Sequence, residues 1–139
     1  MPELDIAALQ AWIGRSTVQR DVVTPAPLHA LTATLDRDDP PVNPGDALPP
    51  CWHWLYFLPT PRASEIGPDG HARRGGFLPP VPLPRRMWAG SRLAFHAPIT
   101  PGQAIERRST IADVQHKAGR RGDLVFVPVQ HEITADGRP

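Results

Sequence analysis

The sequence predicts one α+β domain in which helical segments precede an antiparallel sheet. Apolar residues recur at helical spacing near the N-terminus, in the segments 1–14 and 24–39. A segment rich in proline, glycine and arginine and without periodicity follows at 59–90. Residues 91–134 then alternate apolar and polar side chains as half-buried strands do. The length of 139 residues suits a single compact domain.

The first helix is predicted over residues 1–14. Pro2 suits a first helical turn, where its missing N–H is not needed. One apolar face is formed by Ile6, Leu9 and Ile13. This spacing indicates a helix that packs one side against a core.

The second helix is predicted over residues 24–39. Thr24 is a suitable N-cap, and Pro25 then occupies the first helical position. The apolar stripe consists of Leu28, Leu31 and Leu35. The acidic cluster Asp36, Asp38 and Asp39 precedes Pro40, so the helix must end by Asp39.

The block 51–58 is uniformly bulky and apolar, and we interpret it as a short buried helix. Three strands are expected after it, at 92–99, 104–116 and 124–133. Pro128 donates no hydrogen bond, so it should mark an edge or a bulge. Asp136-Gly137 is a strong two-residue hairpin signal close to the end of the sequence. We therefore expect the sheet to lack its last strand here and the natural polypeptide to continue.

Composition excludes several classes of protein. The net charge of +1 provides no strong positive field, so nucleic acid is not an expected partner. No apolar run approaches membrane-spanning length, and the N-terminus does not resemble an export signal, so a cytoplasmic location is expected. Cys51 stands alone, and the six histidines lack metal-ligand spacing. We expect neither a disulfide nor a metal.

Four motifs carry a resemblance to a known family. They are Thr34–Pro40, Pro50–Pro59, the Arg-Gly-Gly-Phe-Leu-Pro-Pro-Val-Pro-Leu-Pro-Arg-Arg run at 74–86 with its continuation to Gly90, and Arg108–Val114. Through them the chain resembles the N-terminal, fatty-acid-synthase-type dehydratase domain of MaoC-like double hot-dog proteins. The similarity is greatest to members that hydrate mesaconyl-C4-CoA (3-methylfumaryl-CoA) and to the mitochondrial members that dehydrate 3-hydroxyacyl thioesters. It covers nearly the whole chain.

The resemblance implies a hot-dog fold, in which an antiparallel sheet wraps a central helix, and a lyase activity on acyl thioesters. In the family two such halves lie in one polypeptide, and the C-terminal half carries the catalytic aspartate and histidine in a Tyr-x-x-x-His-x-Asp motif. Here His53 lies fourteen residues beyond Asp39, and no such motif occurs. This chain alone is therefore expected to lack the catalytic dyad. Its expected partners are an acyl-CoA and a C-terminal half or second subunit, in a homodimer or heterodimer.

Two groups of residues are candidates for substrate binding. The acyl group would be lined by large side chains with one polar tip: Trp52, His53, Trp54 and Phe57. Coenzyme A, which is part of the substrate and not a separate cofactor, would be held by forked cations, an aromatic ring and permissive glycines: Arg73, Arg74, Gly75, Gly76, Arg85, Arg86 and Trp88. Core packing for the first group and solvated loop residues for the second are the simpler interpretations.

Two other functions remain open from the sequence. A non-catalytic interaction module would present the proline-rich segment 79–84 to an aromatic groove, although no arginine stands where an SH3 ligand needs it. A stand-alone thioesterase-like hot-dog would need an acidic general base on its central helix. None is evident in the block 51–58.

Overall fold

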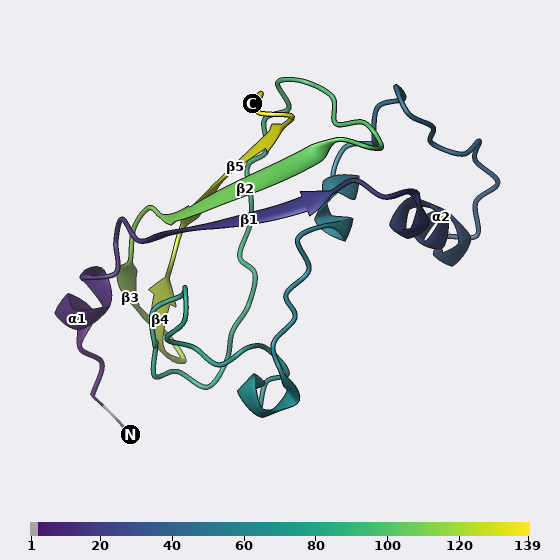
Figure 1. The fold of residues 1–139 in the computed structure, drawn as a ribbon. Coiled ribbons are helices and arrows are strands. Elements are labelled where there is room, and N and C mark those ends of the chain that lie inside the picture. The colour runs from purple at the N-terminus through teal and green to yellow at the C-terminus, as the bar shows by residue number, and fades with distance from the viewer. Residues whose placement is uncertain (1–2) are drawn as a thin grey trace. The chain divides into compact units, whose positions relative to one another are not determined.

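The computed structural model describes residues 3–139, so Pro2, which we placed in a first helical turn, lies outside the described residues. Short helices and antiparallel strands agree with the predicted α+β class (Figure 1). The elements are α1 (Ile6–Gln10), β1 (Ser16–Val22), α2 (Pro25–Thr34), the 3₁₀ turns η1 (Trp52–Leu55) and η2 (Ala63–Glu65), β2 (Ala104–Ile111), β3 (Gln115–Gly119), β4 (Gly122–Phe126) and β5 (Val129–Ala135).

The strands form two sheets. One contains three strands in the order β1-β2-β5, and the other is the hairpin of β3 and β4 (Figure 1). In the hairpin Gln115 lies opposite Phe126, and Gly119 lies opposite Gly122. Beyond the end of β1, Val23 donates its N–H to the carbonyl of Gln103 over 3.0 Å.

The chain divides into two compact units. Unit 1 comprises residues 1–17, 60–91 and 108–131, and unit 2 comprises residues 18–59, 92–107 and 132–139. Each unit has its own buried apolar cluster. In unit 1 it is Leu9, Ile111 and Val114, and in unit 2 it is Val23, Leu28, Leu48, Tyr56, Phe57 and Ile105. That all 139 residues act as one domain stays a prediction.

The first helix is shorter than the predicted 1–14. It begins at Ile6 because Asp5 takes the N-cap position, where its side chain accepts the N–H of Ala8 over 3.0 Å. It ends at Gln10, and Gly14 then adopts a positive φ of 91°. The apolar spacing that continues to Ile13 therefore runs past the end of the helix.

The second helix ends at Thr34, five residues before the predicted Asp39. Asp36 adopts a left-handed φ of 52°, and its N–H reaches the carbonyl of Ala33 while that of Arg37 reaches Thr32. These two bonds make a Schellman ending, which usually has glycine at the left-handed position. An aspartate in that place gave no sequence signal for the helix end.

The predicted strand at 92–99 is wrong, because these residues belong to no strand of the described structure. Leu93 and Phe95 are 43% and 56% exposed. Alternation of apolar and polar residues gives a strand only where a partner strand supplies hydrogen bonds. One backbone hydrogen bond, from the N–H of Leu48 to the carbonyl of Ile99 over 2.7 Å, joins the segment to another part of unit 2, but no strand ladder forms.

The two longer predicted strands are each interrupted. The strand 104–116 breaks after Ile111, because Ile111 and Val114 are both fully buried in one cluster, and a spacing of three places strand residues on opposite faces. The strand 124–133 is divided between β4 and β5 by Pro128, as its missing N–H suggested. The carbonyl of Pro128 accepts the N–H of Ala112 over 2.9 Å.

The predicted two-residue turn at Asp136-Gly137 is confirmed. Ala135 and Arg138 form a bridge across it, and both central residues have positive φ, 50° and 78°. Positive φ at both positions is typical of the type I′ hairpin turn. The returning strand that such a turn would lead into stays a prediction.

The core of unit 2 can be tested with two adjacent valines. Val23 is 1% exposed and Val22 is 47% exposed. Val23→Ala removes two buried methyl groups and should lower the free energy of unfolding by about 2 to 3 kcal/mol. Val22→Ala should lower it by less than about 1 kcal/mol. Urea denaturation measures both, and equal losses would contradict the described core.

Candidate functional site

The candidate acyl-binding residues form a tight turn in unit 2. Cys51 begins it with a left-handed φ of 73°, η1 follows, and Phe57 ends it with a φ of 58°. The predicted short helix is thus a 3₁₀ turn. No residue of η1 is buried. The buried residues are Tyr56 and Phe57, which follow η1 and are 4% and 6% exposed. We call residues 51–57 the aromatic turn.

Two hydrogen bonds hold the aromatic turn against the segment that contains the end of β1. Asp21 accepts the N–H of Phe57 at Oδ2 over 3.0 Å, and its Oδ1 accepts the N–H of Val22 over 2.8 Å. The Tyr56 hydroxyl donates to the carbonyl of Thr24 over 2.6 Å. Left-handed φ in a bulky residue costs about 1 to 3 kcal/mol. These bonds offset that cost and fix where the Phe57 ring lies.

Arg107 of β2 lies over this ring. Its guanidinium carbon is 5.0 Å from the centroid of Phe57, and its Nη2 donates to Oε1 of Gln19 in β1. Its Nε is enclosed and has no hydrogen-bond partner in the described structure. On the other face of the strand pair, Arg20 contacts Glu106 over 3.1 Å. Period-two alternation therefore places Gln19 and Arg107 on the face that carries the aromatic turn.

The electrostatics of the aromatic turn favour a neutral histidine. Burial lowers the pKa of His53 below 6.5, and the positive charge of Arg107 lowers it further. Burial also lowers the pKa of the Arg107 guanidinium, and burial together with Asp21 raises that of Tyr56. At pH 7 His53 is consequently an uncharged ring beside a cation.

The structure gathers most of the predicted acyl-binding group. Trp52 packs against the core of unit 2, and the His53 ring meets that of Phe95 edge-on at 6.1 Å. Trp54 is 58% exposed and contacts His53 at 5.8 Å. Sequence reasoning missed Asp21, Gln19 and Arg107, the polar residues of this region. These residues lie on one face of the paired strands β1 and β2. The sequence does not show that the two strands pair, so it could not indicate that these residues lie together.

The predicted coenzyme A group belongs to unit 1, whereas the aromatic turn belongs to unit 2. Arg74 is engaged within the loop, because its Nη1 donates to the carbonyls of Val81 and Leu83. Gly75 has a positive φ of 92° and donates its N–H to the carbonyl of Leu78 over 3.1 Å. The side chains of Arg73, Arg85, Arg86 and Trp88 are exposed, and Gly76 is exposed as well.

The proline-rich segment is not displayed as a ligand for an aromatic groove. Pro79 is fully buried, and Pro82 is half-buried. Arg74 occupies carbonyls on either side of Pro82. A polyproline ligand needs its ring faces and carbonyls accessible. The conformation therefore does not favour the interaction-module alternative.

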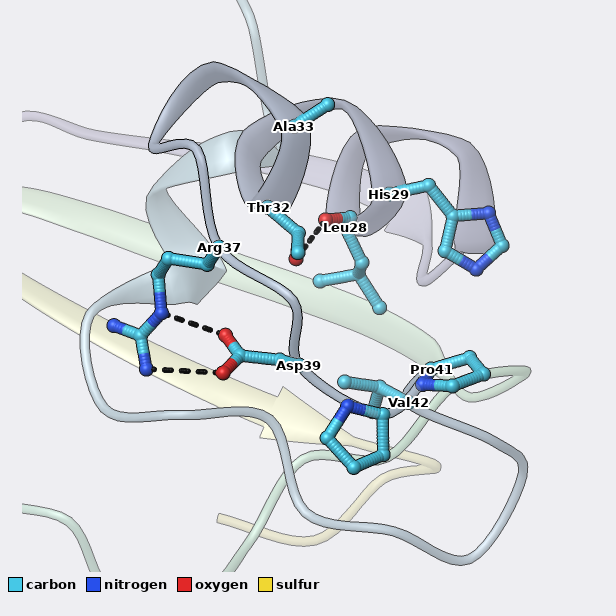
Figure 2. A pocket seen from close by; sticks show the side chains of 9 residues that line it. Leu28, His29, Thr32, Ala33, Arg37, Asp39, Pro41 and Val42 are labelled. Carbon is cyan, nitrogen blue, oxygen red and sulfur yellow. Dashed lines mark hydrogen bonds and ion pairs between the residues drawn. The ribbon is translucent and has the colours of Figure 1, made fainter.

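A small pocket of about 300 Å³ lies beside α2 (Figure 2). Asp39 lines it and forms an ion pair with Arg37, with 2.6 Å between Oδ2 and Nε and 3.3 Å between Oδ1 and Nη2. Both carboxylate oxygens are therefore occupied by the guanidinium, as Figure 2 shows. This agrees with the interpretation of the acidic cluster as a structural helix end.

Within residues 3–139 no group of His, Cys, Asp or Glu is arranged to hold a metal ion. No helix in that range is long and apolar enough to cross a membrane.

Comparison with known proteins decides the family. Residues 51–138 match the family described as hydroxyacyl-thioester dehydratase type 2. The chain belongs to this family. Membership confirms the predicted MaoC-like dehydratase domain and the α+β hot-dog class. The matched region of this dehydratase family begins with the aromatic turn and includes the proline-rich loop and β2 to β5.

The chain is also similar to a hydratase of known name. Over 123 residues the chain is 45% identical to mesaconyl-C(4)-CoA hydratase of Chloroflexus aurantiacus. The alignment covers 88% of this chain and 44% of that protein. The chain therefore spans less than half the length of this hydratase.

The His53 titration can be followed by NMR. Its ring should titrate with a midpoint below 6.5, and Arg107→Gln should raise the midpoint without restoring 6.5, because burial is the larger cause. The folded state binds this proton less readily than the unfolded state does. The free energy of unfolding should therefore decrease as the pH falls below about 6.5. A midpoint at or above 6.5 in the wild type would contradict the described surroundings.

The role of Arg74 in the proline-rich loop can be tested by hydrogen exchange. Arg74→Gln removes the donor shared by two carbonyls, so amides of residues 75–83 should exchange faster. Arg73→Gln is the matched control, because its neighbouring guanidinium has an exposed position. Equal exchange in the two variants would mean that Arg74 does not order the loop.

Proposed function

We propose that this chain is the acyl-accommodating N-terminal half of an acyl-thioester hydratase or dehydratase. The observation that carries the proposal is the 45% identity to mesaconyl-C(4)-CoA hydratase, together with the family match across the aromatic turn and the sheet. In this reaction water adds reversibly to an α,β-unsaturated acyl thioester. Its oxygen bonds to the β-carbon and a proton bonds to the α-carbon.

The proposed role of this half is to hold the acyl group. Trp52 and His53 are half-buried and supply apolar surface in the aromatic turn, next to the buried Phe57 in the chain. The neutral His53 adds a polar edge without a charge. The catalytic aspartate and histidine are assigned to a C-terminal half beyond this chain. The acidic cluster that follows α2 supports this assignment, because Asp39, one of its members, is held in an ion pair with Arg37.

We place the coenzyme A contacts on the proline-rich loop. Exposed guanidinium groups of Arg73, Arg85 and Arg86 suit phosphates, and the exposed Trp88 ring suits adenine. Gly75 and Gly76 would allow the backbone to approach the ligand. Arg74 has the different role of shaping the loop from within.

The proposed substrate is a thioester of a short dicarboxylic acid, similar to mesaconyl-CoA. Mesaconic acid has two carboxyl groups, so a thioester at one of them leaves the other as a carboxylate. The proposal also includes association with the C-terminal half as a homodimer or heterodimer and a cytoplasmic location. The proposal includes no separate cofactor, and addition of water needs no redox cofactor because it involves no net change of oxidation state.

The experiment joins this chain to the C-terminal half of the Chloroflexus aurantiacus hydratase, by fusion and by co-expression. Loss of the conjugated thioester absorbance of mesaconyl-CoA or crotonyl-CoA measures hydration. The joined protein should be active, whereas residues 1–139 alone should bind acyl-CoA without hydrating it. Absence of activity from the joined protein, combined with no acyl-CoA binding by either protein, would refute the proposal.

A further inference from the structure

Arg107 is a half-buried cation that the described structure leaves incompletely paired. Its Nε is enclosed and lacks an acceptor, and Nη2 is bonded to the neutral side-chain amide of Gln19. A buried donor without an acceptor loses its hydration without compensation, and for a charged group this cost is larger. Such a group suits an anionic partner that the chain itself does not provide.

Three carboxylates of unit 2 are engaged by groups other than Arg107. Glu106 pairs with Arg20, Asp39 pairs with Arg37, and Asp21 accepts two backbone N–H groups. None of the ion pairs found among residues 3–139 includes Arg107. Burial is the only cause acting on its pKa, which it lowers, so no neighbouring carboxylate offsets the desolvation of this guanidinium.

The surroundings of Arg107 fit a carboxylate attached to a short carbon chain. The Phe57 ring lies under the guanidinium at 5.0 Å, and the neighbouring His53 is neutral near pH 7. A guanidinium presents parallel N–H donors that match the two oxygens of a carboxylate. Apolar surface beside a planar cation would accept the carbon skeleton and bind the charged end at the same time.

We propose that Arg107 recognises the free carboxylate of a dicarboxylic acyl thioester and so determines specificity for dicarboxylic over monocarboxylic acyl groups. This inference rests on the proposed function and adds to it the residue that selects the substrate class. Gln19 positions the guanidinium through Nη2, and Phe57 supports it from the side of the aromatic turn.

The test compares two probes that differ in this carboxylate. Residues 1–139 are titrated with mesaconyl-CoA and with crotonyl-CoA, and binding is followed by tryptophan fluorescence. The wild type should bind mesaconyl-CoA more tightly. Arg107→Gln should weaken mesaconyl-CoA binding by roughly 10- to 100-fold, the range for a charge-assisted hydrogen bond, and leave crotonyl-CoA within about 3-fold. Arg108→Gln, at an exposed neighbouring position, should change neither.

A ligand-side control avoids any effect of the substitution on folding. The methyl ester of the free carboxylate of mesaconyl-CoA should bind the wild type about as weakly as crotonyl-CoA does. Arg107→Lys, which keeps the charge and loses the fork, should give an intermediate affinity.

The outcomes separate the two proposals. Equal binding of both probes by the wild type, or equal losses for both probes in Arg107→Gln, would overturn the role of Arg107 and leave the acyl-thioester function in place. Failure of the wild type to bind either probe would overturn the role of Arg107, and together with an inactive joined protein that also binds no acyl-CoA it would overturn the acyl-thioester function as well. Loss confined to mesaconyl-CoA, with matching weakness of its ester, would support the assignment.

Discussion

The site in unit 2 depends on the carboxylate of Asp21. It accepts one N–H from its own strand and one from Phe57, and so joins the segment at the end of β1 to the end of the aromatic turn. Phe57 has a left-handed backbone that a bulky residue rarely adopts without support. The hydroxyl of Tyr56 adds a second bond to the following segment, at Thr24. Fixing the Phe57 ring in this way creates the surface on which Arg107 rests.

Strand alternation then divides the charges of unit 2 between two faces. Arg20 and Glu106 neutralise each other on one face, whereas Gln19 and Arg107 meet on the face of the aromatic turn. Exposed ion pairs such as the first contribute little to stability. The second arrangement leaves a desolvated cation beside an aromatic ring and a neutral histidine. Stability alone does not explain such an arrangement, and binding of an anionic acyl group would.

Local patterns predicted the class of fold, the turn at Asp136-Gly137 and the break at Pro128, whereas the short buried helix predicted at 51–58 is a 3₁₀ turn. They did not predict events that depend on distant partners. The end of α2 follows from a left-handed Asp36, and the strand at 92–99 lacks a neighbour to pair with. The aromatic part of the site was visible because bulky residues cluster in the sequence. Its polar part, Asp21, Gln19 and Arg107, became visible only when the pairing of β1 with β2 brought Gln19 to Arg107, 88 positions away in the sequence.

The placement of Arg107 on the Phe57 ring can be measured directly by a ¹³C-edited NOESY experiment on the free protein. We expect cross-peaks between the Phe57 ring protons and the δ-protons of Arg107, and a shift of those δ-protons to higher field from the ring current. Absence of these cross-peaks, with the δ-protons at the position of an exposed arginine, would show that Arg107 does not lie on the Phe57 ring.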